Sequence, residues 1–319
     1  MKSFWEKLPK PFFCLAPMAD VTDSAFRRII CKYGKPDVFW TEFVSADGLA
    51  NEKGRKKLLI NLKFSKNEHP IVAQIFGANP ENIKYASALC AKLGFDGIDI
   101  NMGCPDRAIE KQGAGAKMMQ NQKLAGEIIE SAKVGAKGLS VSVKTRIGYN
   151  KDEIDTWVSF LLEQNLSALT VHLRTRKEMS LVPAHWELAK KIVTLRNKIN
   201  KKTLIIFNGD VVSIEDGIKK ARMCGCDGAM IGRGIFGNPW LFANKIPSIK
   251  QKLKVLIEHT KLFEKELGKH KSFAVMKKHF KAYVNGFDGA KELRIKLMET
   301  ENAKEVEKII KEFLKRKGK

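Results

Sequence analysis

The chain contains no long uninterrupted run of apolar residues. No stretch reaches the ~18 residues that a membrane-spanning helix needs. The first residues, from Met1 to Glu6, also lack the apolar segment of a secretory signal. We therefore expect a soluble, cytoplasmic protein with no membrane partner.

Cysteine is scarce, with six residues among 319. Their positions, at 14, 31, 90, 104, 224 and 226, form no disulfide framework for a chain of this size, which is typical of a reducing compartment. Cys224-Gly225-Cys226 has no second Cys or His pair at zinc-binding spacing. We expect these two thiols to pack in a turn, and we expect no metal.

Acidic side chains are also in deficit, with 35 Asp and Glu against 58 Lys and Arg and a net charge of +23. Such a charge favours a polyanionic partner, nucleic acid first. Because 46 of the 58 basic residues are lysine, a general compositional bias is the alternative explanation. Residues 244–319 carry +11 of this charge and the other 243 residues carry +12. That concentration favours a nucleic-acid role.

Short apolar segments alternate with helical patterns up to about residue 236. The segments cover residues 12–16, 38–43, 71–76, 97–102, 139–145, 168–173, 204–208 and 229–232. Several are almost continuously apolar, as strands buried on both faces are. Residues 80–93 have helical spacing, with Asn79 as the cap, Pro80 at the first helical position and Gly94 after the end. Eight such units, and no GxGxxG loop, predict an α/β fold, a (β/α)8 TIM barrel rather than an open sheet.

Strand patterns cease after Trp240. Helical patterns then cover residues 249–267 and 272–284, and two shorter helices begin near Asp288 and Glu301. We predict a catalytic TIM-barrel domain over residues 1–243 and a small, basic, all-helical domain over residues 244–319.

Polar residues follow seven of the eight predicted strands. The carboxyl ends of barrel strands meet at one mouth, so we expect these residues to share one site. They are the Ala16-Pro17-Met18-Ala19 turn, Gln74, Asn101 with Cys104, Lys144, His172 with Arg174 and Arg176, Asn208-Gly209-Asp210, and Gly232-Arg233-Gly234.

The last two of these turns follow the seventh and eighth predicted strands, which is the usual phosphate site of the fold. Their glycines let backbone N–H groups approach a phosphate, and a following helix N-terminus favours an anion. Arg233 adds a charge-assisted hydrogen bond. We predict phosphate binding here over the alternative of tight turns with a surface arginine.

Three side chains have competing interpretations. Lys144 is a cation beside a reduced flavin ring, a Schiff-base lysine, or a lysine at the edge of the core. His172 lies beside two arginines, which favours a ligand-facing role over a core imidazole. Cys104, in the turn Asn101-Met102-Gly103-Cys104-Pro105, is a proton donor or acceptor by its position, whereas most free cysteines are small buried hydrophobes. Residues 110–117, with glycine hinges, predict a mobile lid that carries Cys104.

Taken in order, these motifs resemble those of the tRNA-dihydrouridine synthase family of flavin enzymes. The matching motifs are Ala16-Pro17-Met18, Gln74-Ile75-Phe76-Gly77, Asn101-Met102-Gly103-Cys104-Pro105, Val143-Lys144-Thr145-Arg146, His172-Leu173-Arg174-Thr175-Arg176, Asn208-Gly209-Asp210 and Gly232-Arg233-Gly234. The resemblance covers residues 12–242, and the basic helical segment is similar to the tRNA-binding domain of the family.

The resemblance implies a monomer that binds FMN in the barrel mouth and uses NADPH or NADH to reduce it. Hydride then passes from flavin N5 to C6 of a uridine in tRNA, and a cysteine protonates C5 to give 5,6-dihydrouridine. Cys104 occupies the position of that acid. Flavin-site positions are occupied by Pro17, Met18, Ala19, Gln74, Lys144, His172, Asn208, Gly209, Asp210, Gly232 and Arg233. Asn101, Arg174 and Arg176 occupy substrate-facing positions, with Asn101 at the uracil edge.

Two features depart from the family pattern. Leu173 stands where many members have glycine, and residues 181–186 lack the glycine common in bacterial members. Both lie at the substrate-facing rim and leave the target uridine open.

Two other functions compete with this one. A flavin barrel that acts on free pyrimidines is disfavoured by the basic helical segment. A non-catalytic RNA-binding protein is disfavoured by the presence of Cys104 and Lys144.

Overall fold

A closed parallel barrel forms the larger part of the molecule. The computed structural model describes residues 3–317, and nine strands of this part form one sheet: β1 Phe12–Leu15, β2 Phe39–Trp40, β3 Val44–Ser45, β4 Ile71–Phe76, β5 Gly97–Met102, β6 Ser140–Arg146, β7 Ala168–His172, β8 Leu204–Asn208 and β9 Gly228–Ile231. The neighbour order is β1-β9-β8-β7-β6-β5-β4-β2, and β3 also pairs with β4. A parallel bridge between Cys14 and Val38 joins the two ends of the sheet.

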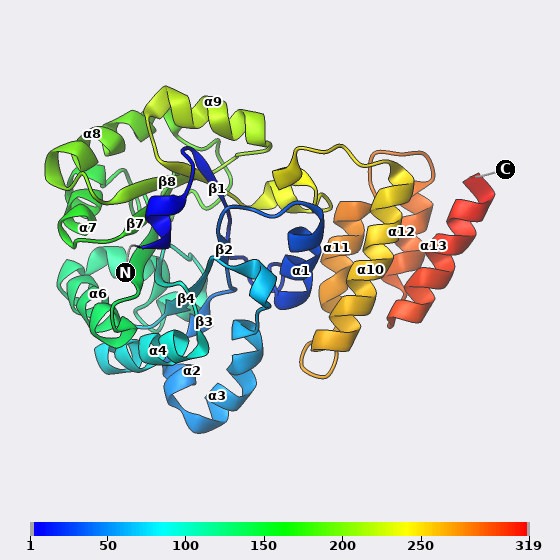
Figure 1. Ribbon diagram of the computed structural model, residues 1–319, viewed down its shortest axis with the longest axis horizontal. Helices are drawn as coiled ribbons and strands as arrows, with labels where there is room; N and C mark the ends of the chain where they lie inside the picture. The colour runs from blue at the N-terminus through cyan, green and yellow to red at the C-terminus, as the bar shows by residue number, and fades with distance from the viewer. Residues whose placement is uncertain (1–2, 318–319) are drawn as a thin grey trace.

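Helices surround this barrel on its outer side (Figure 1). They are α1 Ser24–Tyr33, α2 Ala46–Ala50, α3 Glu52–Leu58, α4 Pro80–Leu93, α6 Gln122–Ala136, α7 Ser159–Glu163, α8 Ala189–Ile199 and α9 Ile214–Cys224. The short helix α5, Arg107–Glu110, belongs to the loop that follows β5. The bounds of α4 agree with the prediction, because Asn79 caps its first turn and Gly94 ends it with φ 88°. The (β/α)8 TIM-barrel prediction is confirmed.

One predicted strand is broken. Residues 38–43 were expected to form a single strand, but the chain pairs with β4 through two separate short strands, β2 and β3. Glu42 lies between them and is buried. Its carboxylate accepts a 2.6 Å hydrogen bond from the Asp20 amide and contacts Lys271 Nζ at 2.9 Å. These contacts come from distant parts of the chain, so no local pattern announces them.

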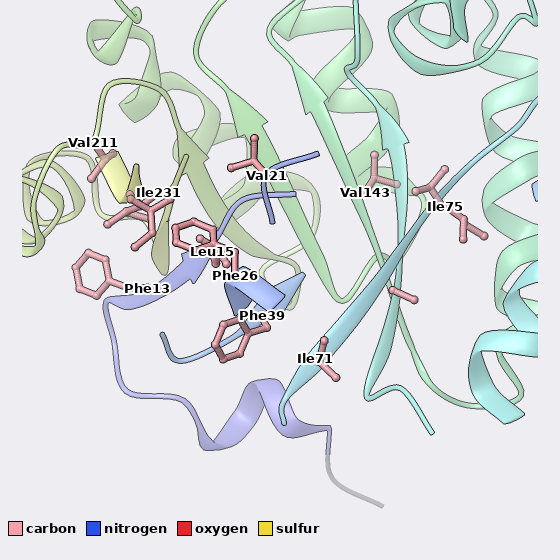
Figure 2. Close-up of a cluster of buried hydrophobic side chains, with 14 of the residues drawn as sticks. Phe13, Leu15, Val21, Phe26, Phe39, Ile71, Ile75, Val143, Val211 and Ile231 are labelled. Atoms are coloured by element: carbon pink, nitrogen blue, oxygen red, sulfur yellow. The ribbon is translucent and has the colours of Figure 1, made fainter. Parts of the chain in front are cut away.

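Alternate strand residues face the helices or the barrel axis, as the two-residue period of a strand requires. Outward-facing residues such as Leu15, Val143 and Ile231 belong to the main hydrophobic cluster, part of which Figure 2 shows. A second hydrophobic cluster, which includes Trp5, fills the barrel interior toward the amino ends of the strands. Its members are Trp5, Phe12, Cys14, Ala16, Val38, Trp40, Val72, Ala168, Ile206 and Met230.

Polar residues replace apolar ones in the interior toward the carboxyl ends of the strands. The polar residues on β4 and β5 are Gln74, Asp99 and Asn101, and they follow the apolar positions along these strands. Lys144 of β6 pairs in register with Asn101. The barrel therefore has an apolar floor and a polar mouth, and only the mouth can hold a polar ligand.

Four further helices lie beside the barrel: α10 Ile249–Leu267, α11 Met276–Tyr283, α12 Ala290–Met298 and α13 Ala303–Lys317. They pack on one another, and α10 and α11 lie next to α1 (Figure 1). The ring of Phe26 on α1 stacks on that of His259, with 4.9 Å between ring centroids, and meets the ring of His279 edge-on, with 4.8 Å between centroids. None of the helices in the described residues has the length and apolar composition of a membrane span. The division into two domains at residue 243 stays a prediction.

Candidate active site

A cavity of about 550 Å³ opens at the carboxyl ends of the strands. Nine of the predicted flavin-site residues line it: Pro17, Met18, Lys144, His172, Asn208, Gly209, Asp210, Gly232 and Arg233. Two others lie elsewhere, since Ala19 is exposed and Gln74 is fully buried in the barrel interior. Arg146, which the sequence places with Lys144 at the end of a predicted strand, also lines the cavity, and so do Met179, Ser180 and Val212, which were assigned no site role.

One end of the cavity presents unpaired backbone donors. The amides of Gly209, Asp210, Gly232, Arg233 and Gly234 have no hydrogen-bond acceptor within the described part of the chain. Gly209 has φ 130°, and a Cβ there would lie 2.8 Å from the Ala184 methyl carbon. Free N–H groups in two neighbouring turns are donors of the kind that a phosphate requires, so these residues fit the phosphate end of a flavin nucleotide.

Positive groups also line the cavity. Burial and the charge of Arg146 lower the pKa of Lys144 to about 8. The pKa of His172 is well below its usual range. Burial is the largest cause, and the positive charges of Arg146, Lys144 and Arg174 lower the pKa further. His172 is therefore neutral at pH 7 and can both donate and accept a hydrogen bond. This positive potential suits a ring that gains negative charge on reduction.

Below the cavity, a chain of hydrogen bonds connects a buried carboxylate to the cysteine turn. Asp99 accepts from Ser142 Oγ and from Gln74 Nε2, both at 2.6 Å. Gln74 Oε1 accepts from Asn101 Nδ2 at 3.1 Å, and Asn101 Oδ1 accepts from the Cys104 amide at 2.9 Å. Burial raises the pKa of Asp99 to about 6. Gln74 and Asn101 thus have fixed amide orientations, which fix the start of the turn.

Cys104 is half-buried, and among the described residues it is not part of the cavity lining, although Pro105, the next residue in the chain, is. Burial raises the pKa of its thiol, although the Asp106 amide and the charges of Lys144 and Arg146 oppose this in part. The thiol is therefore protonated at pH 7. A protonated thiol is suited to donate a proton rather than to attack as a nucleophile.

The two arginines predicted to face substrate are both held in ion pairs. Arg174 is buried, pairs with Asp210 and donates to the Val182 carbonyl at 2.6 Å. Arg176 pairs with Glu110. Their contact with a substrate stays a prediction.

The Cys224-Gly225-Cys226 segment packs in the turn that leads into β9. Cys224 is buried in the main core, and Cys226 Sγ donates to the Gly228 carbonyl at 3.3 Å. Among the residues that the structure describes, no three His, Cys, Asp or Glu side chains gather in a metal-binding arrangement.

The model of one protein family, described as dihydrouridine synthase, matches residues 14–317. The chain belongs to the dihydrouridine synthase family. A probable tRNA-dihydrouridine synthase from Staphylococcus aureus (strain Mu50) is 44% identical over 317 residues, which are 98% of this chain and 96% of the relative. Probable tRNA-dihydrouridine synthase 2 of Bacillus subtilis (strain 168) is 43% identical, with 98% and 97% covered. The predicted family, and with it an oxidoreductase that uses a flavin, is confirmed.

Solved structures share the fold of this dihydrouridine synthase family member at low sequence identity. An old yellow enzyme homologue from Zymomonas mobilis is 14% identical, with a TM-score of 0.53 over 77% of this chain and 94% of that one. A histamine dehydrogenase from a Rhizobium species is 15% identical, with a TM-score of 0.51 over 78% of this chain and 48% of that one. These likenesses concern the barrel fold alone.

Lys144→Met is expected to stabilise the ligand-free enzyme and to weaken its binding of flavin. Burying this ammonium lowers its pKa to about 8, so the folded chain holds the proton less tightly than the unfolded chain does. The resulting loss of folding stability is complete below pH 8, and it decreases as the pH rises toward about 10.4, the pKa of lysine in the unfolded chain. Urea unfolding at pH 7 and pH 10 measures the stability, and flavin titration measures the affinity. Exposed Lys92→Met is the control, and a less stable variant at pH 7 would contradict the argument.

Sequence reasoning did not assign roles to Asp99 and Glu110, and it placed Arg146 at a strand end with Lys144 without giving it a role of its own. Asp99 carries a signal, because it is a lone charge within the apolar run of β5. Arg146 stands two residues after Lys144 and so faces the same side of β6. Glu110 has no local signal, since its partner, Arg176, lies 66 residues away.

Proposed function

We propose that this enzyme reduces a uridine of tRNA to 5,6-dihydrouridine, with FMN bound in the barrel mouth and NADPH or NADH as the reductant. The observation that carries the proposal is one cavity lined by free backbone donors of two glycine-containing turns and by the cations Lys144 and Arg146, with the protonated thiol of Cys104 next in the chain to the lining residue Pro105. The printed names of the relatives supply tRNA as the substrate.

The residues at the two ends of the cavity would hold the cofactor. The amides of Gly209, Gly232 and Gly234, with Arg233, would bind the FMN phosphate. Lys144 and His172 would face the ring, where the ammonium favours the reduced, more negative form. When bound, FMN supplies the hydride equivalent that no amino-acid side chain can provide.

The remaining residues would act on the uracil. Cys104 donates a proton to C5, and its buried, neutral state keeps that proton available at pH 7. The Asn101 amide uses one N–H on Gln74 and its oxygen on the amides of the turn, so one N–H remains for a uracil carbonyl. Reaching these groups requires the base to be turned out of the folded RNA.

The helical segment would bind the body of the tRNA. The loop after α10 carries Lys271, which contacts Glu42 at 2.9 Å and Asp20 at 3.3 Å, two residues after cavity-lining Met18. Nearby Lys269, Lys277 and Lys278 belong to the same end of the helical segment. Their charge, close in the chain to Lys271, supports a tRNA-binding surface at this end of the helical segment.

Replacing Lys269, Lys277 and Lys278 together by glutamine is expected to weaken tRNA binding and to reduce its salt dependence. Each lysine that contacts a phosphate should lower the slope of log Kobs against log salt by roughly 1. The matched control replaces Lys245, Lys250 and Lys254, near the opposite end of the ~28 Å helix α10. Equal slopes of log Kobs against log salt for the two triple variants would show that tRNA does not bind preferentially at this end of the segment.

The function itself is tested in cells and with purified enzyme. Dihydrouridine should disappear at one or more tRNA positions when the gene is removed, and return when it is restored. Purified enzyme should be yellow and should oxidise NADPH or NADH in the presence of undermodified tRNA. Rapid reduction of free uracil with no activity on tRNA would instead support the free-pyrimidine enzyme.

A further inference from the structure

An ion pair links the loop that carries Cys104 to a different loop of the barrel mouth. Glu110 ends α5, and its carboxylate binds both the Nε and Nη2 groups of Arg176, the first at 2.8 Å. The Glu110 side chain is only 9% exposed and that of Arg176 is 25% exposed. A bidentate pair shielded in this way is stronger and more specific in geometry than a pair in open solvent.

A tyrosine from a third loop completes the cluster. The Arg176 guanidinium lies over the ring of Tyr149, 5.4 Å from its centre. Tyr149 also interacts with Glu110, which helps to raise the pKa of the tyrosine. Burial alone would raise the pKa of Glu110, but the bonds from Arg176 and Tyr149 lower it below its usual range. Glu110 is therefore ionised at pH 7. The loops that follow β5, β6 and β7 meet at these three residues.

The Arg176 side of this contact is rigid. The Arg176 amide donates to the Gly148 carbonyl at 2.9 Å. Arg146 then donates to the Thr175 carbonyl at 3.0 Å and, through Nε, to the Gly103 carbonyl at 2.8 Å. Arg176 thus stands on a segment that hydrogen bonds already tie to the barrel.

The Glu110 side of the contact leads directly to the thiol. Ile109, the residue before Glu110, is buried with Phe76, and Cys104 packs against this small cluster. The Ala116 amide donates to the Cys104 carbonyl at 2.9 Å, and a Cβ on Gly115 would lie 2.7 Å from that oxygen. Because these contacts are close, a shift of α5 would move Cys104 with it.

We propose that Glu110 and Arg176 are positioning residues for the reaction: their ion pair holds α5 in place and keeps the Cys104 turn at the wall of the cavity. This inference rests on the proposed function, in which Cys104 delivers a proton. Arg176 then acts through Glu110 rather than by contact with the RNA.

The experiment compares E110Q, R176Q, R176K and the exchanged pair E110R/R176E in the flavin-loaded enzyme. The first readout is the rate at which iodoacetamide modifies Cys104, followed by mass spectrometry of its peptide. The second is kcat and KM for tRNA. D155N, which breaks the exposed Lys191–Asp155 pair, is the matched control. Flavin absorbance and thermal unfolding report whether each variant is folded and loaded.

Loss of the pair should free the Cys104 turn. E110Q and R176Q are expected to raise the modification rate several-fold and to lower kcat by about 10- to 100-fold, with little change in KM. The modification rate and kcat of R176K should lie between those of R176Q and the unchanged enzyme. E110R/R176E should partly reverse both the rise in modification rate and the fall in kcat.

Three results would overturn the inference: an unchanged modification rate in E110Q, a rise in KM alone in R176Q, or an exchanged pair no better than R176Q. If the unchanged enzyme reduced no uridine, the proposed function would fail, whereas the modification rates would still decide whether the pair holds the turn.

Discussion

Cys104→Ala is expected to bind flavin and to be reduced by NADPH or NADH at the normal rate, but to form dihydrouridine about 10²- to 10⁴-fold more slowly. That range is the usual contribution of a positioned acid. The free-energy barrier rises because the variant lacks the proposed proton donor, while the groups proposed to face the flavin are unchanged. Single-turnover reduction of tRNA, with the flavin reduced beforehand, separates the two half-reactions.

Cys31→Ala is the matched control for this variant. Cys31 is also a half-buried thiol, but it lies on α1 and donates to the Asn67 carbonyl at 3.1 Å, away from the cavity. Its replacement should leave both half-reactions unchanged. Normal dihydrouridine formation by Cys104→Ala would contradict the assignment of this thiol as the acid.

Arg27→Met is expected to lower the free energy of unfolding by about 3–5 kcal/mol, because it leaves a buried carboxylate without its partner. Arg27 of α1 and Glu68 are both fully buried and are joined by a 2.6 Å contact. The guanidinium also donates to the carbonyls of Thr22 and Lys63, at 2.7 and 2.6 Å. Urea unfolding followed by circular dichroism measures the loss.

Two further variants separate charge burial from packing. Adding Glu68→Gln to Arg27→Met removes the unpaired charge while keeping an acceptor for the Ser65 amide, so part of the stability should return. Lys56→Met breaks the exposed pair with Glu52 and should change stability by less than about 1 kcal/mol. A double variant no more stable than Arg27→Met would show that packing, not charge, is responsible.

Local pattern predicted the elements of the barrel well. The helix over residues 80–93 and the strands over residues 71–76, 97–102 and 204–208 have the predicted bounds. These segments carry clear local signals: a cap, a helix-breaking glycine, or a predominantly apolar run between turns. The prediction of a single strand over residues 38–43 was wrong, because Glu42 makes its contacts with Asp20 and Lys271, which are distant in sequence.

Most of the candidate site was also predictable, since fold class alone places strand ends at one mouth. Lys144 and His172 line the cavity as expected. What the pattern did not reveal is how each side chain is used. Gln74 is turned inward to Asp99, and Arg176 is engaged by Glu110. Strand periodicity specifies the face on which a residue lies, but not its hydrogen-bond partner.

The amino-acid sequence by itself determined the barrel, the helical segment and the set of residues at the mouth, because alternation and turn chemistry are local properties that short segments carry. Only the tertiary structure decided which donors stay free for a phosphate, which cations remain without a partner, and how three loops hold the turn of Cys104. Those features depend on the distances between residues far apart in the chain, and only folding sets those distances.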